Sequence, residues 1–261
     1  MATAPAGRNA RYREIENWLR EQCAANPAGH LLPAEVELAE RFGVSRMTAR
    51  QAYQALANEG IVERRRGIGT TVAPPRLHRA EATLYSFTDD MLRRNLTPSS
   101  KLLVADVITS PGDAAVLKLP ADAPIVRIHR IRYADGSPIA FEQVALPGDF
   151  AGVLEFDLET GSLHAAMAQL GRRMAKASGF VSARLATPID CTLLDLVPPA
   201  ALLVESRLIT DVDGRPTERA ETAYVGSRWA LDTGPYLPAA MDAARAAPMA
   251  PASGPRAAAT T

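Results

Sequence analysis

An internal repeat constrains the fold of the second half of the chain. Residues 120–145 and 198–223 align at a constant offset of 78, which places Asp135-Gly136 over Asp213-Gly214. In each copy, two runs of alternating apolar residues flank the Asp-Gly pair, a pattern typical of a β-hairpin. Two such copies predict an antiparallel sheet around a pseudo-twofold axis, in the α+β class. The apolar stretches before the hairpins, which we expect to be short helices, are residues 113–119 and 190–196.

Charge divides the chain into two parts. The first 80 residues hold 12 Lys and Arg against 8 Asp and Glu, whereas the other 181 hold 17 against 21, so the neutral total hides a basic and an acidic part. Only the basic part is expected to meet a polyanion. Pro74-Pro75 predicts a break between the two, and an Ala/Pro/Ser-rich end is typical of disorder. The expected parts are a head (9–73), a linker (74–83), a body (84–236) and a disordered tail (237–261).

The head has the order of elements of a winged helix-turn-helix. Gly43 supplies a sharp turn, and Ser45 is a candidate N-cap for the helix that follows it. This fold places the second helix of the pair in the major groove of DNA and its hairpin against the backbone or minor groove. The expected helices are residues 12–23, 34–41 and 45–58, and the expected strands are 61–63 and 70–72.

Arginines stand where such a head meets DNA. Arg46 and Arg50 lie one turn apart on the outward face of the expected second helix, and both can reach guanine O6 and N7. Three consecutive arginines at the tip of the expected hairpin would neutralise phosphates. They are Arg64, Arg65 and Arg66.

The head is also similar to a known family. It carries Leu-Pro-Ala-Glu at 32–35, Phe-Gly-Val-Ser-Arg-Met-Thr-Ala-Arg-Gln-Ala at 42–52 and Gly-Ile-Gly-Thr at 67–70. Over residues 10–73 it resembles the DNA-binding domain of GntR-type bacterial transcriptional regulators, although Val36 replaces an arginine that many relatives carry. The resemblance implies operator contacts by Ser45, Arg46, Thr48 and Arg50, with Arg66 and Gly67 at the wing tip.

Strand parity gathers charged residues on one face of the body. Arg130 and Arg132 point to the same side of their expected strand. A three-residue turn at 134–136 would bring Glu142 to that side, whereas a two-residue turn would send it to the opposite face. Glu218 shares a parity with Tyr224 in the second copy. These residues form either ordinary Arg–Glu pairs on a solvated face or a pocket for a small anion.

The body resembles a known module as well. The resemblance rests on Leu84–Met91, Arg130-Ile131-Arg132, Gly161-Ser162-Leu163 and Gly214–Glu218, and it points to the UTRA effector domain of HutC-like GntR regulators, with a chorismate-lyase-like fold. That family implies small-metabolite ligands, such as phosphorylated amino sugars in one branch. His164 stands where many relatives have tyrosine, and Gly-Ser-Arg-Trp at 226–229 replaces Gly-Asp-Arg-Tyr. The implied ligand contacts are Ser86, Thr88, Arg130, Arg132 and Ser162 for the anionic group and Glu142, Glu218 and Tyr224 for the remainder.

Several classes of protein lack their motifs here. Cys23 and Cys191 are isolated, no hydrolase motif occurs, and no apolar run has the length of a signal peptide or a membrane span. We therefore expect a cytoplasmic protein with no membrane partner, cofactor or metal. The histidines, none of which has metal-ligand spacing, are His30, His78, His129 and His164.

The leading hypothesis is a ligand-responsive transcriptional regulator, most often a repressor in this family, without enzymatic activity. It would bind a palindromic double-stranded operator as a homodimer, with a small anionic metabolite (a phosphosugar or a carboxylate) as effector. The alternative is an enzyme that keeps chorismate-lyase-like chemistry on the body. A third reading, a protein-binding winged helix, is disfavoured by the arginines of the head.

Overall fold

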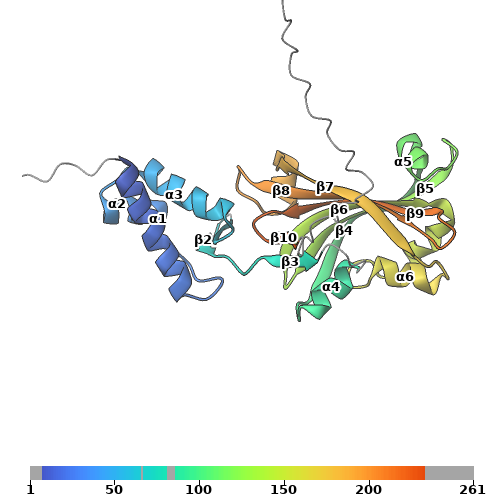
Figure 1. Ribbon diagram of the computed structural model, residues 1–261, viewed down its shortest axis with the longest axis horizontal. Helices are drawn as coiled ribbons and strands as arrows, with labels where there is room; N and C mark the ends of the chain where they lie inside the picture. The colour runs from blue at the N-terminus through green and yellow to red at the C-terminus, as the bar shows by residue number, and fades with distance from the viewer. Residues whose placement is uncertain (1–7, 66, 81–85, 233–261) are drawn as a thin grey trace, which may run out of the picture.

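The computed structural model describes residues 8–65, 67–80 and 86–232, which form a head and a body joined end to end (Figure 1). The expected disordered tail lies outside these residues. The head contains α1 (Arg8–Ala25), α2 (Glu35–Phe42) and α3 (Arg46–Asn58), followed by the antiparallel strands β1 (Val62–Arg65) and β2 (Gly69–Val72). This is the predicted winged helix-turn-helix, with β1 and β2 as its wing.

Local residues set the ends of the head helices. Gly43 ends α2 in the left-handed conformation, with φ of 61°, which favours glycine. The Ser45 hydroxyl accepts the Thr48 N–H and caps α3, as predicted. The inward face of α3 packs on α1 and α2 in one apolar cluster. Its fully buried members include Ile15, Leu19, Leu38, Ala49, Ala52, Tyr53 and Leu56.

The body is built on one six-stranded antiparallel sheet with the order β4-β5-β6-β9-β8-β7. The repeat is visible in this order, because the units β4-β5-β6 and β7-β8-β9 meet at the central pair β6 and β9. The strands are β4 (Pro98–Thr109), β5 (Pro124–Ala134), β6 (Ser137–Pro147), β7 (Lys176–Leu185), β8 (Ala201–Thr210) and β9 (Pro216–Val225).

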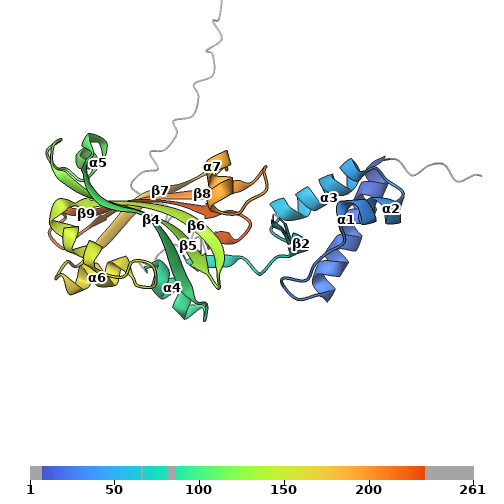
Figure 2. The same ribbon diagram turned by 180° about the vertical axis from the view of Figure 1, so that it is seen from behind.

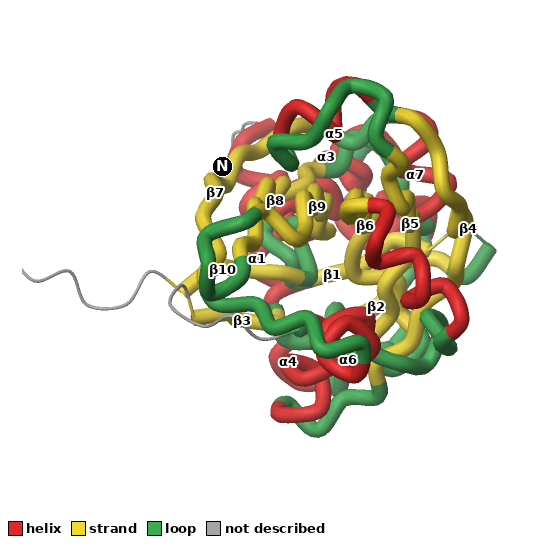
Figure 3. The backbone as a smooth tube through the Cα atoms, turned by 90° about the vertical axis from the view of Figure 1, so that its right-hand side faces the viewer, coloured by secondary structure: helices red, strands yellow, loops and turns green. Residues whose placement is uncertain are grey.

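Helices cover both faces of the sheet (Figure 3). The expected helices before the hairpins are α5 (Pro111–Val116) and α7 (Pro188–Leu193), and they lie on one face. On the other face lie α4 (Phe87–Arg93), the 3₁₀ segment η1 (Gly148–Glu155) and α6 (Leu163–Gln169). The pocket described below lies between α4 and α6.

The first hairpin has the shorter of the two turns considered, together with a bulge that was not expected. Ala134 pairs with Ser137, so the loop is the two-residue Asp135-Gly136, and both of its residues have positive φ. A two-residue loop alone would send Glu142 to the face opposite Arg130. However, the register shifts after Arg132, where Ile139 forms a β-bulge, and the extra residue restores the parity. The second hairpin shifts in the same way at Thr217, 78 residues later.

The stretch expected to be a plain linker contains a strand. β3 (Leu77–Ala80) pairs in parallel with β10 (Trp229–Asp232), the last described strand of the body. The segment that follows the wing is therefore hydrogen-bonded to the strand that follows the six-stranded sheet. None of the helices in the described part of the chain is long and apolar enough to cross a membrane.

Candidate effector pocket and DNA-binding face

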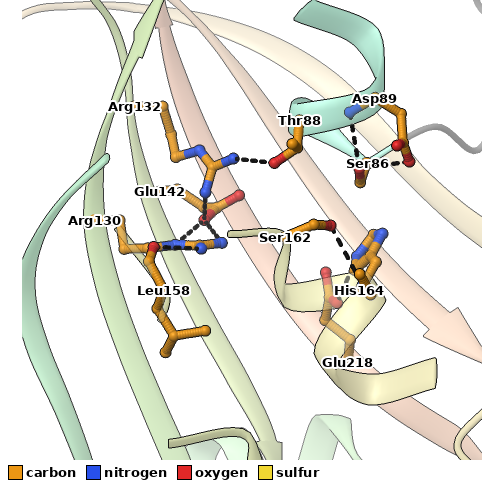
Figure 4. Close-up of polar contacts among 11 residues, drawn as sticks. Ser86, Thr88, Asp89, Arg130, Arg132, Glu142, Leu158, Ser162, His164 and Glu218 are labelled. Atoms are coloured by element: carbon orange, nitrogen blue, oxygen red, sulfur yellow. Dashed lines mark hydrogen bonds and ion pairs between the residues drawn. The ribbon is translucent and has the colours of Figure 1, made fainter. Parts of the chain in front are cut away.

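A small polar pocket opens on the sheet between the first turns of α4 and α6 (Figure 4). Its charged residues come from four neighbouring strands, and its hydroxyl groups come from the starts of the two helices. The lining residues are Ser86, Phe87, Thr88, Arg130, Arg132, Glu142, Ser162, Leu163, His164, Arg207 and Glu218.

Arg130 and Glu142 form the floor of the pocket. They face each other directly across β5 and β6, and Arg130 donates Nε and Nη2 to one carboxylate oxygen at 2.9 and 2.6 Å. Its Nη1 donates to the Leu158 carbonyl at 3.2 Å. Burial raises the pKa of Glu142, but the two arginines beside it lower that pKa more strongly, to about 2. Each guanidinium nitrogen of Arg130 thus already donates within the protein, and Glu142 stays a carboxylate at neutral pH.

Arg132 is buried with spare hydrogen-bond donors. Its side chain is 3% exposed, and its guanidinium lies 4.3 Å over the ring of Phe87. Nη2 makes a long bond of 3.4 Å to the Thr88 hydroxyl, whereas Nε and Nη1 have no hydrogen-bond partner within the described chain. Burial lowers the pKa of Arg132 to about 10, so the group stays charged at neutral pH. The pocket thus presents a cation with unsatisfied donors.

Arg207 adds a second cation with a spare donor. It reaches the pocket from β8, and its Nη1 is buried without a hydrogen-bond partner in the described chain. Its nearest ion-pair partner is Glu205, at 3.8 Å. Burial lowers the pKa of Arg207, but Tyr224 and nearby carboxylates outweigh that effect and raise it. The three arginines of the lining outnumber its two glutamates, so the pocket carries a net positive charge when His164 is neutral.

His164 and Glu218 close the opposite side of the pocket. His164 Nε2 lies 2.9 Å from a carboxylate oxygen of Glu218, which is 2% exposed. Burial raises the pKa of Glu218, but the contact with His164 and the charge of Arg207 bring it below its ordinary value. The cavity volume is about 20 Å³, room for about one water molecule. A metabolite can enter only if the walls move apart.

Seven of the eight residues expected around the effector line this pocket, and Tyr224 does not. Its ring stacks on Trp229, with centroids 4.2 Å apart, inside an apolar cluster. Tyr224 is therefore absent from the lining in this structure, and its contact with a ligand stays a prediction. The sequence analysis did not assign Arg207 to the pocket. The signal that could have found it is an arginine among the apolar residues of a strand. The seven residues that the structure brings together are Ser86, Thr88, Arg130, Arg132, Glu142, Ser162 and Glu218.

The start of α3 presents Arg46 and Arg50 to solvent, whereas Thr48, which was also expected to contact DNA, is buried. Arg46 is 72% exposed, and Arg50 is exposed as well. Ser45 and Thr48 are engaged in the N-cap, where their hydroxyls lie 2.9 Å apart. Gly67 is exposed at the wing tip with φ of 79°. The side chain of Arg65 and the whole of Arg66 lie outside what the structure describes.

Arg64 does not share this exposure. Its side chain is 16% exposed, its Nη2 donates to Glu35, and it lines a cavity between the head and the body. Arg64 is thus ion-paired and largely covered in this structure, and its contact with a phosphate stays a prediction.

The buried pair at the pocket floor makes stability depend on pH. The ordinary pKa of Glu142, 4.5, is lowered to about 2 by folding, so its carboxylate stabilises the body above about pH 4.5. This contribution is lost as the pH falls from about 4.5 toward 2. Glu142→Gln leaves Arg130 buried without its charge partner, and we expect it to cost about 3–5 kcal/mol near neutral pH.

Urea unfolding of the full chain at several pH values measures this effect. The free-energy difference between the wild type and Glu142→Gln should shrink as the pH falls below about 4.5. Glu155→Gln, at an exposed position, is the matched control and should follow the wild type. A difference that stays constant with pH would contradict the assignment of Glu142 as a charged partner.

Comparisons with known proteins agree with this architecture. Residues 11–72 match the family described as bacterial regulatory proteins, gntR family, and residues 93–230 match the UTRA domain. The HTH-type transcriptional repressor NagR of Bacillus subtilis is 34% identical over 200 residues, which cover 76% of this chain and 82% of NagR. The repressor PhnF of Mycolicibacterium smegmatis is 29% identical over 232 residues, covering 87% and 93% of the two chains.

A solved structure leads to the same result. The crystal structure of PhnF from Mycobacterium smegmatis superimposes with a TM-score of 0.60 and 26% identity, covering 85% of this chain and 99% of that one. The head, the body and their order along the chain are thus shared with a known repressor. This chain belongs to the HutC-like branch of the GntR family of bacterial transcriptional regulators, with an N-terminal winged helix-turn-helix followed by a UTRA domain.

Proposed function

We propose that this protein is a ligand-responsive transcriptional repressor whose body binds a small anionic metabolite. The observation that carries the proposal is the set of buried guanidinium donors without hydrogen-bond partners on Arg132 and Arg207. A buried charged donor without a partner is costly, and an anionic ligand removes that cost. Two relatives, NagR and PhnF, are named repressors, which supports repression as the output.

The chemistry of the pocket favours a phosphate or carboxylate group with a polar remainder. Arginine donors match the oxygens of such anions and bind them in pairs. Ser86, Thr88 and Ser162 offer hydroxyl groups around the same space. On the other side, His164 and Glu218 are suited to a hydroxyl or an amine of the ligand. A sugar phosphate and a small hydroxy acid both meet this description.

The head is the DNA-binding part of the proposal. Arg46 and Arg50 are exposed at the start of α3, where a recognition helix meets base edges. One head covers one half-site, so two heads related by a twofold axis require a palindromic double-stranded operator. A protein that regulates a chromosomal operator acts in the cytoplasm.

The edge strand β7 supports a homodimer with a second copy of this chain. β7 lies at the edge of the sheet, and adjacent residues on it, which point to opposite faces, are both exposed. Phe180 is 66% exposed, Val181 42% and Leu185 68%. A long edge strand with large apolar residues is a template for pairing with another strand. The twofold axis needed for a palindrome makes the same strand of a second copy its partner.

The charges of the pocket disfavour the enzymatic alternative. A general acid or base works best with a pKa near the working pH. Folding instead lowers the pKa of Glu142 to about 2 and moves that of Glu218 downward as well. The carboxylates of the pocket are therefore fixed as partners of cations. Release of product from chorismate by the purified protein would overturn this conclusion.

We expect Arg50→Ala to lose specific operator binding while the fold and the dimer remain. A bidentate arginine contact is worth about 1–3 kcal/mol of base discrimination, and a twofold dimer loses it in both half-sites. The operator is first selected from a random duplex library with the wild type, and gel-shift titrations then compare the variants. Arg215→Ala removes the same charge at an exposed site of the body and should bind as the wild type does. Equal affinity of Arg50→Ala and the wild type would sink the assignment of the recognition helix.

We expect an anionic ligand to raise the melting temperature of the full chain. At 100 times its Kd, a ligand that binds only the folded state stabilises it by about 2.7 kcal/mol. The screen uses inorganic phosphate, sugar phosphates and small carboxylates. Arg132→Met should fold, because Glu142 keeps its closer partner Arg130, and should lose the shift. Arg127→Met, which breaks a pair with Asp106 outside the pocket, should keep it. A shift retained by Arg132→Met would mean that the ligand binds elsewhere.

We expect Phe180→Glu combined with Leu185→Glu to convert a dimer into a monomer. Each change places a charge where β7 would meet the second copy, and buried unpaired charges are strongly unfavourable. Sedimentation velocity measures the result. Val212→Glu changes a residue that is 78% exposed on the turn of the second hairpin and should remain dimeric. A dimer that survives both changes on β7 would exclude this edge as the interface.

A further inference from the structure

One buried ion pair joins the head to the body. Arg228 Nε donates to Glu63 Oε1 at 2.7 Å, across 165 positions of sequence. Glu63 lies on β1 of the wing, and Arg228 lies between β9 and β10 of the body. The side chains are 3% and 5% exposed. Breaking a pair as buried as this is costly, because each charge would lose a close partner inside the protein.

Other described contacts lie beside this pair, and the Ser227 carbonyl is so near Gly60 that a Cβ there would lie 2.5 Å from it. Gln54 donates to the Pro199 carbonyl at 3.2 Å, and Arg76 of the connecting segment donates to the Asn58 carbonyl at 3.4 Å. Both contacts are exposed, and they border a cavity of about 210 Å³ between the head and the body. Contacts between domains of one chain permit relative motion unless the interface is large and apolar. Among the described residues, Glu63 and Arg228 form the one buried ion pair that joins the two parts.

Arg228 also touches the machinery of the body. Its Nη1 donates to the Pro138 carbonyl at 2.6 Å, one residue before the bulge at Ile139, and its own carbonyl accepts the N–H of Leu77 on β3 at 2.9 Å. One residue thus holds the wing, the connecting strand and the first hairpin.

A short row of residues leads from Arg228 to the pocket. The next residue, Trp229, stacks on Tyr224. Tyr224 pairs across the sheet with Ala140, and Ala140 pairs with Arg132, the buried cation of the pocket. A shift of Arg132 toward a ligand therefore acts on β6, which carries Pro138, and on β9, which carries Tyr224. Pro138 contacts Arg228, and Tyr224 contacts the next residue, Trp229.

We propose that Glu63 and Arg228 form a latch that holds the head on its own body in one orientation. The C-terminal end of α3 points toward the body and its DNA-reading start points away (Figures 1 and 2). The latched head is thus free to meet DNA, but its direction is fixed. In a dimer, that direction sets the distance between the recognition helices, which must match half-sites about 34 Å apart. The regulatory consequence, that the effector acts by changing the latch, rests on the proposed function.

Distance measurements between spin labels test the latch without DNA or ligand. The spin labels are attached to cysteines introduced in place of Glu21 on α1 and Asp122 before β5, both of which are exposed. In this variant the two native cysteines, Cys23 and Cys191, are replaced by serine. Dilution with unlabelled protein confines the signal to one chain. The latched protein should give one narrow distance distribution, and Glu63→Gln and Arg228→Gln should each lose that single peak.

Matched variants separate the latch from loss of the fold. Glu14→Gln removes an exposed carboxylate from an ion pair within α1 and should keep the narrow distribution. Glu63→Gln leaves the bond from Arg228 to Pro138 in place, so it carries the test if Arg228→Gln fails to fold. A narrow, unchanged distribution in folded Glu63→Gln would overturn the latch. Operator binding and ligand shifts are measured separately, so their failure would overturn the proposed function and leave the latch standing.

Discussion

A buried guanidinium group must find a partner, and this requirement organises the whole molecule. Arg130 and Arg228 are both nearly inaccessible to solvent and both hydrogen-bonded to a carboxylate, Glu142 in the pocket and Glu63 in the wing. Satisfied pairs of this kind hold backbone segments together. Arg132 and Arg207 are buried in the same sheet with donors that lack hydrogen-bond partners in the described chain. A further buried donor without such a partner, Arg64 Nη1, lies in the head, so the two arginines of the sheet differ from it in lining one pocket.

The repeat explains how so many charges come to lie on one face. Each hairpin combines a tight turn with one β-bulge, at Ile139 in the first copy and at Thr217 in the second. A bulge shifts the alternation of side chains by one residue. Without it, Glu142 would face away from Arg130 and leave that arginine uncompensated in the interior. The bulge is therefore what allows Glu142 to pair with Arg130 after a two-residue turn.

The topology brings the sensing and DNA-binding parts close to one another through the end of the sheet. β3 leaves the wing and pairs with β10, which follows β9 directly. β9 in turn lies beside β6, which carries Glu142 and the bulge. The pocket and the wing are thus connected through hydrogen-bonded strands and one aromatic stack, without a long flexible segment between β9 and the head contact.

The sequence by itself determined the local elements and the two parts. Helical spacing, Gly43 and Ser45 sufficed for the winged helix-turn-helix, and the offset of 78 sufficed for the two hairpins, because these features depend on neighbouring residues. Only the tertiary structure decided the partners of the charged groups. In it, Arg64 pairs with Glu35, Tyr224 stacks on Trp229, Arg207 lines the pocket and Glu63 pairs with Arg228. These pairings depend on strand register and on contacts between residues far apart in the chain, and no local pattern encodes them.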